Sequence, residues 1–265
     1  MLLKISHTTK YTYDVPVIYA LQQVRLTPLS IKQQKVLNWQ LDIEGGQIEA
    51  GYTDHHGNHT DLVSVDVDTL HVSITARGAV ETTDSAGILG QVSGGPPLWY
   101  FQQPTKLTEP GPGIARLGAA LAQNEDRLMA LHGLSNAVRE TVTFGSDDTY
   151  VATTAEEALS GGTGVCQDHA QIFIAAARVG GIPARYVSGY LMINDQIDQE
   201  AGHAWAEAWQ DDLGWVGFDV SNGVAPDERY VRTAIGRDYR DAAPLSGLRM
   251  GGSAESMIVS LQVQQ

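Results

Sequence analysis

The chain has 265 residues, of which 43% are hydrophobic and 18% charged, so it is long enough for one or two globular domains. Its net charge of −14 leaves no basic footprint of the kind that nucleic-acid binding requires, which excludes that class of function. A single cysteine excludes an internal disulfide, and no stretch approaches the ~18 apolar residues of a membrane span. Because the opening MLLKISHTTKYTYDVPV also lacks a signal-peptide core, we expect a cytoplasmic protein that does not associate with membranes.

Residues 1–84 have the pattern of β-strands. The segments HTTKYTYDVPV, VLNWQLDIEG and LVSVDVDTLHVSITARG alternate apolar and polar residues or are rich in Thr, Tyr and Val. Glycine-containing turns separate them, and no window has a convincing amphipathic helical pattern. We therefore predict an N-terminal module of antiparallel strands over residues 1–84, arranged as a β-sandwich or half-barrel.

The composition then changes. Residues 85–113 are dense in Gly and Pro, which predicts a connector. Helical spacing follows in IARLGAALAQ, DRLMALHGLSNAVRETV and VCQDHAQIFIAAARVGG, and TAEEALSGG is a short helix with a capping threonine and a glycine stop. Strand patterns come next in IPARYVSGYLM, HAWAEAWQ, GWVGFDV and ESMIVSLQVQ. The sequence thus predicts an α+β domain over residues 114–265.

The only cysteine, Cys166, follows the stretch GGTG and begins a predicted helix. The unpaired N–H groups and the dipole at a helix N-terminus stabilise an anion, and the thiolate is the nucleophilic form of cysteine. Gly161, Gly162 and Gly164 would let the backbone approach a substrate carbonyl without an intervening side chain. Cys166 also lies on the apolar stripe of its helix, so a buried structural role stays open on this evidence alone.

A histidine and an aspartate would complete a catalytic triad with Cys166, the histidine as the base and the aspartate as the residue that orients it. In HAWAEAW, alternation places His203, Trp205 and Glu207 on one strand face and alanines on the other, where they suit packing against the cysteine helix. Asp219 ends the next strand, and antiparallel pairing through the QDDLG turn brings it beside His203. We expect Asp219 to accept the Nδ1–H of His203, which leaves Nε2 facing the thiol. Asn222 is the alternative orienter, because cysteine–histidine sites can use an amide there.

The segments GVCQDHAQIFIAAARVGGIPARYVSGYL, HAWAEAW and GWVGFDVSNG, in this order, closely resemble the bacterial transglutaminase-like superfamily. The tail GRDYRDAAPLSGLRMGG also looks like that family's, and HTTKYTYDVPV and DHHGNHT are similar to the β-rich N-terminal region that often precedes the domain. The resemblance covers nearly the whole chain. It implies a papain-like transglutaminase core over residues 114–265 and assigns Cys166, His203 and Asp219 as the catalytic triad.

One position departs from the family. His169, three residues after the cysteine, stands where the family commonly has an aromatic residue. We interpret it as a packing substitute, with contact to the thiol as the alternative. Asp168 matches the family pattern and is expected to support the start of the helix.

Other histidines and two arginines do not indicate a second site. The segment DHHGNHT contains three histidines, but their spacing matches no standard zinc pattern and Gly57-Asn58 is a turn dipeptide. We expect no metal and no cofactor. Arg178 and Arg185 flank the loop after the cysteine helix and are expected to be surface or ion-pair residues.

The resemblance and the residues together predict a cysteine-dependent amide hydrolase of peptidase, isopeptidase or amidase type. Cys166 would attack the amide carbonyl of a peptide or protein, with its own N–H as one oxyanion donor. Protein-glutamine transglutaminase activity uses the same triad and stays open, as does a non-catalytic interaction module of the same fold. Hydrolysis is favoured because water is always present and the chain shows no evident amine site. The resemblance also suggests a functional association with ATP-grasp peptide ligases.

Overall fold

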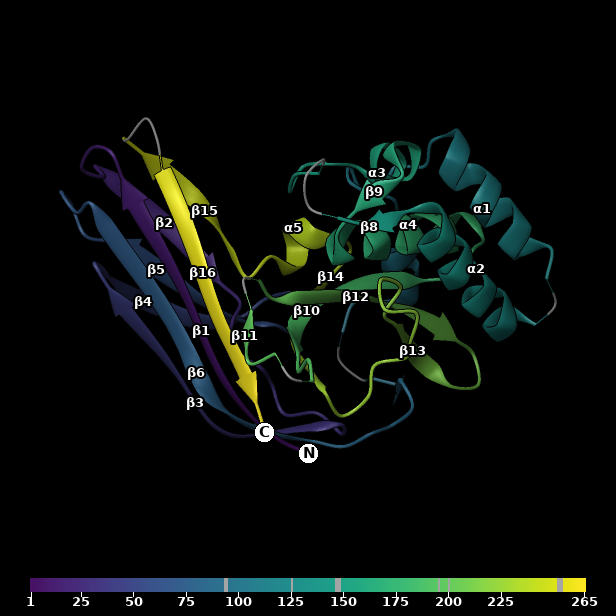
Figure 1. The fold of residues 1–265 in the computed structure, drawn as a ribbon, viewed down its shortest axis with the longest axis horizontal. Coiled ribbons are helices and arrows are strands. Elements are labelled where there is room, and N and C mark those ends of the chain that lie inside the picture. The colour runs from purple at the N-terminus through teal and green to yellow at the C-terminus, as the bar shows by residue number, and fades with distance from the viewer. Residues whose placement is uncertain (93–94, 125, 146–148, 195, 200, 252–254) are drawn as a thin grey trace.

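The fold is taken from a computed structural model, which describes residues 1–92, 95–124, 126–145, 149–194, 196–199, 201–251 and 255–265. Two parts lie side by side in Figure 1: long β-strands on the left, and on the right a second sheet with helices above it. The parts meet around the short helix α5 (Tyr239–Ala242) and the strands β10 (Ala184–Leu191) and β14 (Tyr230–Gly236). The mixed α and β content confirms the predicted α+β class.

The N-terminal part is built from two antiparallel sheets. Its first six strands are β1 (Leu2–Tyr13), β2 (Tyr19–Val24), β3 (Gln34–Glu44), β4 (Gly46–Thr53), β5 (His59–Val65) and β6 (His71–Thr82). Alternate residues of β1 are buried, among them Leu3 and Ile5, so one face of the strand packs into a core shared by both sheets. This arrangement confirms the predicted β-sandwich-like module.

The last strands of the chain return to these sheets. β15 (Leu245–Met250) pairs with β2, and β16 (Glu255–Gln264) pairs with β1 along ten residues. The sheet orders are β15-β2-β5-β4 and β11-β16-β1-β6-β3, where β11 (Asp198–Gln199) is a short edge strand. As a result the two chain termini lie close together in Figure 1. The β16 segment was correctly predicted as a strand, but chain order alone grouped it with residues 114–265; the domain boundaries themselves stay predictions.

The second part is a five-stranded antiparallel sheet with helices on one face. Its strand order is β14-β10-β12-β13-β7, where β12 spans His203–Gln210, β13 spans Gly214–Phe218 and β7 spans Ile88–Gly90. The helices on that face are α1 (Pro112–Ala122), α2 (Arg127–Thr141), α3 (Ala155–Gly161) and α4 (Cys166–Val179). The short helix η1 (Leu98–Gln102) lies on the opposite face, where Phe101 contacts Trp215 and Arg185. Among the described residues, no helix combines the length and the apolar character needed to cross a membrane.

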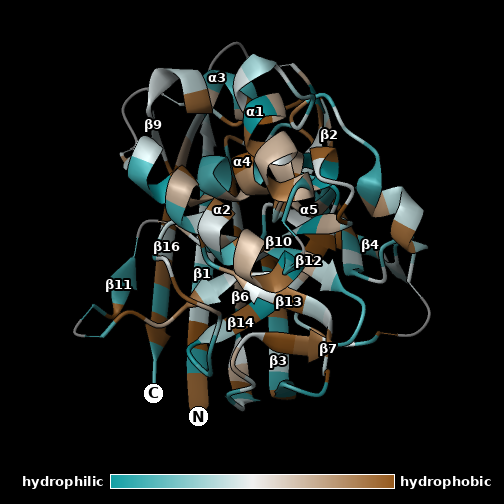
Figure 2. Ribbon diagram, turned by 90° about the vertical axis from the view of Figure 1, so that its right-hand side faces the viewer, coloured by the Kyte–Doolittle hydropathy of each residue, from teal (hydrophilic) through white to brown (hydrophobic). Residues whose placement is uncertain are grey.

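Helix α4 is the buried centre of this part. The alanine face of β12, formed by Ala204, Ala206 and Ala208, belongs to the same apolar core as α4, as the strand pattern predicted. Small side chains let the helix approach the strand closely, which holds the first residue of α4 near the start of β12. Figure 2 shows the helical layer above the sheet, with hydrophobic and hydrophilic residues interspersed along the helices.

Candidate active site

Cys166 is the first residue of α4 and is partly buried. The chain reaches it from α3 through Gly162, whose φ of 73° lies in the left-handed region, and through β9 (Thr163–Gly164), which pairs in parallel with β8 (Thr143–Phe144). At Gly164 a Cβ would lie 2.7 Å from the Cβ of Asp168. Gly162 therefore serves the turn and Gly164 the packing of Asp168, while the approach of this backbone to a substrate carbonyl stays a prediction.

Asp168 supports the start of the helix, as predicted. Its Oδ2 accepts a hydrogen bond from Val165 N–H at 2.9 Å, and the side chain is buried. Burial raises the pKa of the Asp168 carboxyl, against the opposing effect of that hydrogen bond. This contact holds the residue that precedes Cys166 in an extended conformation.

His169 is buried and both of its ring nitrogens face backbone carbonyls. Nδ1 lies 2.9 Å from Val165 O, and Nε2 lies 3.0 Å from Val142 O. The ring thus joins the first turn of α4 to the residue that follows α2. This geometry favours the packing interpretation of His169 over contact with the thiol.

His203 and Asp219 come together at the ends of the hairpin strands β12 and β13. Their pairing is antiparallel, and His203 Nε2 lies 2.6 Å from Asp219 Oδ2. The expected ring orientation was wrong: the aspartate binds Nε2, so Nδ1 is the nitrogen that remains for Cys166. Alternation along a strand predicts the face on which a ring lies, whereas its orientation about χ2 depends on neighbours from other elements.

Asp219 is completely buried and accepts hydrogen bonds from four residues. Oδ2 accepts from His203, from the Asn222 side-chain amide at 2.7 Å and from the Tyr230 hydroxyl at 2.7 Å. Oδ1 accepts from the Ser221 hydroxyl at 2.8 Å and from the Asn222 backbone N–H at 3.2 Å. Burial raises the pKa of Asp219, but these donors outweigh it and lower the pKa to about 2. The carboxylate is therefore charged at neutral pH, and Asn222 contacts this carboxylate.

The charge on Asp219 controls the protonation of His203. Burial lowers the pKa of His203, but hydrogen bonds with Asp219 and Cys166 and the charges of both groups raise it to about 10. The rings of Trp205 and Tyr230 flank the imidazole, with centroids 6.4 and 5.9 Å from its own. At neutral pH the ring is consequently an imidazolium between a carboxylate and the cysteine.

Tyr230 and Ser221 are contacts of Asp219 that sequence reasoning missed, and Tyr230 is the more distant of the two along the chain. It begins β14, eleven residues after Asp219 and beyond the strand hairpin, so no local pattern connects the two. Only the pairing of β14 with β10, which in turn pairs with β12, brings its hydroxyl to the carboxylate.

Replacing Tyr230 with phenylalanine is expected to lower kcat about tenfold, the effect of removing one hydrogen bond to a buried charge. The pKa of Asp219 should rise because its charged form loses a donor, so the acidic limb of the pH–rate profile should move to higher pH. The matched control is Tyr190→Phe, which removes a buried hydroxyl that contacts His7 at 3.0 Å, away from the site. Equal kcat values and pH profiles in the two variants would show that Tyr230 does not position Asp219.

The two arginines expected at the surface or in ion pairs are both buried. Arg185 makes an ion pair with Glu207, and its Nε lies 2.7 Å from Glu207 Oε2. Arg178 donates to the carbonyls of Phe101, Ala184 and Arg237 and to the Thr108 hydroxyl. The surface alternative was therefore wrong for both, and the ion-pair alternative is confirmed for Arg185.

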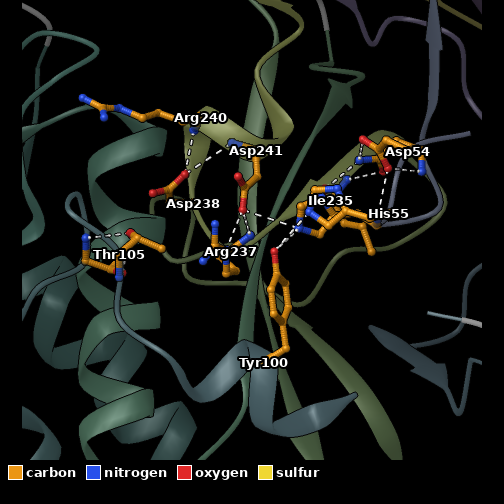
Figure 3. A network of polar contacts seen from close by, with 12 residues as sticks. Asp54, His55, Tyr100, Thr105, Ile235, Arg237, Asp238, Arg240 and Asp241 are labelled. Atoms are coloured by element: carbon orange, nitrogen blue, oxygen red, sulfur yellow. Dashed lines mark hydrogen bonds and ion pairs between the residues drawn. The ribbon is translucent and has the colours of Figure 1, made fainter. Parts of the chain in front are cut away.

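The histidines of DHHGNHT lie at two separate contacts. Nε2 of His55 and of His56 lie 3.1 and 3.2 Å from the Tyr100 hydroxyl, and His59 Nε2 lies 3.1 Å from Asp61. Figure 3 shows Tyr100 extending from η1 toward this turn. Within the described ranges, no group of three His, Cys, Asp or Glu residues is placed to hold a metal ion.

A cysteine at a helix N-terminus, with its histidine and aspartate on an adjoining antiparallel hairpin, defines the papain-type class of cysteine-enzyme core. Residues 116–220 match the transglutaminase-like superfamily, and residues 3–81 match the bacterial transglutaminase-like N-terminal region. The chain therefore belongs to the transglutaminase-like superfamily and carries this bacterial N-terminal region, as the sequence predicted.

Similar proteins span different shares of the chain. An uncharacterized protein of Mycobacterium leprae is 27% identical over 98% of both chains. A protein-glutamine gamma-glutamyltransferase of Pseudomonas aeruginosa is 36% identical over 104 residues, which are 34% of this chain and 15% of that protein. The crystal structure of a protein from Cytophaga hutchinsonii, proposed to be a cysteine protease, has a TM-score of 0.77 at 21% identity and covers 100% of this chain and 98% of its own. This structural similarity shows that the fold extends over the whole chain.

Proposed function

We propose that this protein is a cysteine-dependent amide hydrolase that acts on a peptide or protein through a Cys166–His203–Asp219 triad. The observation that carries the proposal is the position of His203, whose ring is hydrogen-bonded by the buried Asp219 carboxylate and interacts with Cys166. An imidazolium that interacts with the only thiol in the chain supports the proposal. A thiolate with such a partner is the reactive nucleophile of cysteine enzymes.

The reaction takes place in two half-reactions. Cys166 Sγ forms a bond to the amide carbonyl carbon, and the developing oxyanion is met by the Cys166 backbone N–H, which as the first residue of α4 has no acceptor within the helix. The C–N bond breaks as His203 gives its proton to the leaving amine, and the acyl group stays on sulfur as a thioester. His203 then takes a proton from water as the water oxygen bonds to the thioester carbonyl carbon. The C–S bond breaks, the carboxylic acid leaves, and Cys166 remains as a thiolate beside the protonated His203.

Acyl transfer is the second candidate, and a specific similarity supports it. The matched segment of the Pseudomonas aeruginosa protein belongs to a protein-glutamine gamma-glutamyltransferase, which by its name transfers a glutamyl group. In that case an amine replaces water in the second half-reaction, while acylation of Cys166 stays the same. The chain's net charge of −14 would favour cationic amines such as lysine side chains.

A partition experiment tests the proposal. A glutamine-containing peptide and an isopeptide-linked peptide are each incubated with the protein and a labelled primary amine at millimolar concentration, and products are weighed by mass spectrometry. We expect the hydrolysed acid to dominate with the wild-type protein and to be absent with Cys166→Ala. Accumulation of the labelled amide, dependent on Cys166, would identify a transglutaminase; absence of both products would favour the non-catalytic interaction module.

A further inference from the structure

A cavity of about 460 Å³ lies between the N-terminal module and the second sheet. Its walls are the loop before β3, the turn between β4 and β5, residues of β10 and β14, and the residues Gln91, Val92 and Gly95. Arg185 and Glu207 are paired across β10 and β12, on the face opposite the alanines that meet α4. The cavity therefore lies behind the sheet that carries His203, and its volume is typical of small-molecule sites at domain interfaces.

The charge of the lining is opposite to that of the chain. Asp and Glu number 31 in the whole protein and Lys and Arg only 17, yet the described lining residues include Lys32, Arg185 and Arg232 and no carboxylate. One carboxylate stands behind them: Glu207 Oε2 contacts Arg185 at 2.7 Å and Arg232 at 3.0 Å. The single negative charge of Glu207 is shared by two guanidinium groups, and Lys32 adds a third positive charge. The lining therefore has an excess of positive charge.

Two of the three cationic residues, Arg185 and Arg232, are held in place by the surrounding structure. The Arg185 guanidinium lies 3.9 Å from the centroid of the Trp215 ring, and Arg185 is only 4% exposed. The side-chain amide of Gln34 makes two hydrogen bonds of 2.9 Å with the backbone N–H and carbonyl of Arg232. A site whose donors are already fixed loses little conformational entropy on binding.

A second amide closes the other side of the cavity. Asn58, in the turn between β4 and β5, makes two hydrogen bonds of 2.8 Å with the backbone of Ile235. Figure 3 shows this contact region, where Asp54 and Ile235 lie together and Tyr100 points toward them. The hydrogen bonds of Gln34 with Arg232 and of Asn58 with Ile235 both join the N-terminal module to β14, an edge strand of the second sheet. Both parts of the chain are therefore needed to form the cavity.

The remaining walls are largely apolar. Leu29, Ile31, Leu89 and Ile235 line the cavity beside the cationic groups. Guanidinium groups are suited to bind carboxylate and phosphate oxygens, and the apolar walls suit a hydrocarbon body. We propose that this cavity binds a small organic oxyanion, a carboxylate or a phosphate ester, with its charged end at Lys32, Arg185 and Arg232 and its apolar part against the aliphatic walls.

Calorimetric titration of the full chain at low ionic strength tests this inference, independently of any catalytic activity. The probes are hexanoate, hexyl phosphate and the uncharged hexanamide. We expect at least one of the two anions to bind and the amide to bind at least about tenfold more weakly, because it lacks the charge. The tighter of the two anions identifies the oxyanion class.

Charge reversals at two exposed lysines locate the binding. The lysine variants are compared at about 0.15 M ionic strength, where exposed charges more than about 8 Å apart are largely screened. Lys32→Glu, in the lining, should raise the Kd about tenfold or more, whereas Lys35→Glu, three residues away on β3 and outside the lining, should change it by less than about twofold. Arg232→Gln should abolish binding, and thermal melting checks that this variant is folded. If it is unfolded, the comparison of the Kd values of Lys32→Glu and Lys35→Glu tests the proposal. Failure of both anions to bind, equal binding of the amide, or equal effects of the two lysine variants would each overturn the proposal.

Discussion

Replacing Asp219 with asparagine is expected to lower turnover by about 10²–10⁴-fold, in the range found when the carboxylate of a nucleophile–base–orienter triad is neutralised. The substitution keeps the shape of the side chain but removes the charge that holds His203 as an imidazolium. Asn222→Ala should cost less than about tenfold, because it removes one side-chain hydrogen bond from a carboxylate that keeps the backbone N–H of residue 222 and three other donor residues. The measurement is kcat for release of amine from a peptide amide.

Thermal melting of both variants controls for the fold. Asp219 is fully buried, and its asparagine variant turns one acceptor position into a donor that faces other donors, so some loss of stability is expected. Turnover is therefore compared well below both melting temperatures. If Asn222→Ala loses as much turnover as Asp219→Asn, or more, Asn222 and not Asp219 is the residue that orients His203.

Removing the imidazole is expected to slow the alkylation of Cys166 by iodoacetamide at pH 7 by about 10- to 30-fold, because a thiol with the ordinary pKa of about 8.5 is only about 3% thiolate at that pH. The pKa of His203 is raised to about 10, so at pH 7 the ring is charged and stabilises a neighbouring thiolate. That stabilisation is fully present below the ordinary histidine pKa of about 6.5 and is lost as the pH rises through about 10. The rates of wild type and His203→Ala should therefore differ most on the acidic side and converge above pH 10.

The matched control for this experiment is His71→Ala, which removes an exposed histidine from β6 in the N-terminal module. Its alkylation rate should equal that of the wild type across the pH range, because it does not alter the surroundings of the thiol. With one cysteine in the chain, each rate reports on Cys166 alone. If the alkylation rates of wild type and His203→Ala have the same pH dependence, the imidazolium of His203 does not stabilise the Cys166 thiolate.

The local elements of this protein follow from its sequence. The 3.6-residue spacing around Cys166 and the period-two alternation of HAWAEAW predicted α4 and β12, because each pattern reports which face of one element is buried. The short turn between β12 and β13 likewise makes the two strands antiparallel neighbours, which brings His203 and Asp219 together. The helix–hairpin arrangement that carries all three proposed catalytic residues was accordingly predictable.

Contacts between distant segments were decided by the tertiary structure alone. Alternation predicted β16 as a strand but could not say that its partner is β1, because the apolar periodicity is the same in either sheet. Arg185 was expected at the surface or in an ion pair, but the sequence did not indicate its partner. It forms a buried pair with Glu207 because β10 and β12 place the two residues opposite each other. The ring nitrogen that meets Asp219, the Tyr230 hydroxyl and the cation-lined cavity depend in the same way on side chains that converge from separate strands. The sequence determines the period and the hydrophobic face of each element, whereas strand partners and side-chain orientation are settled when those elements pack together.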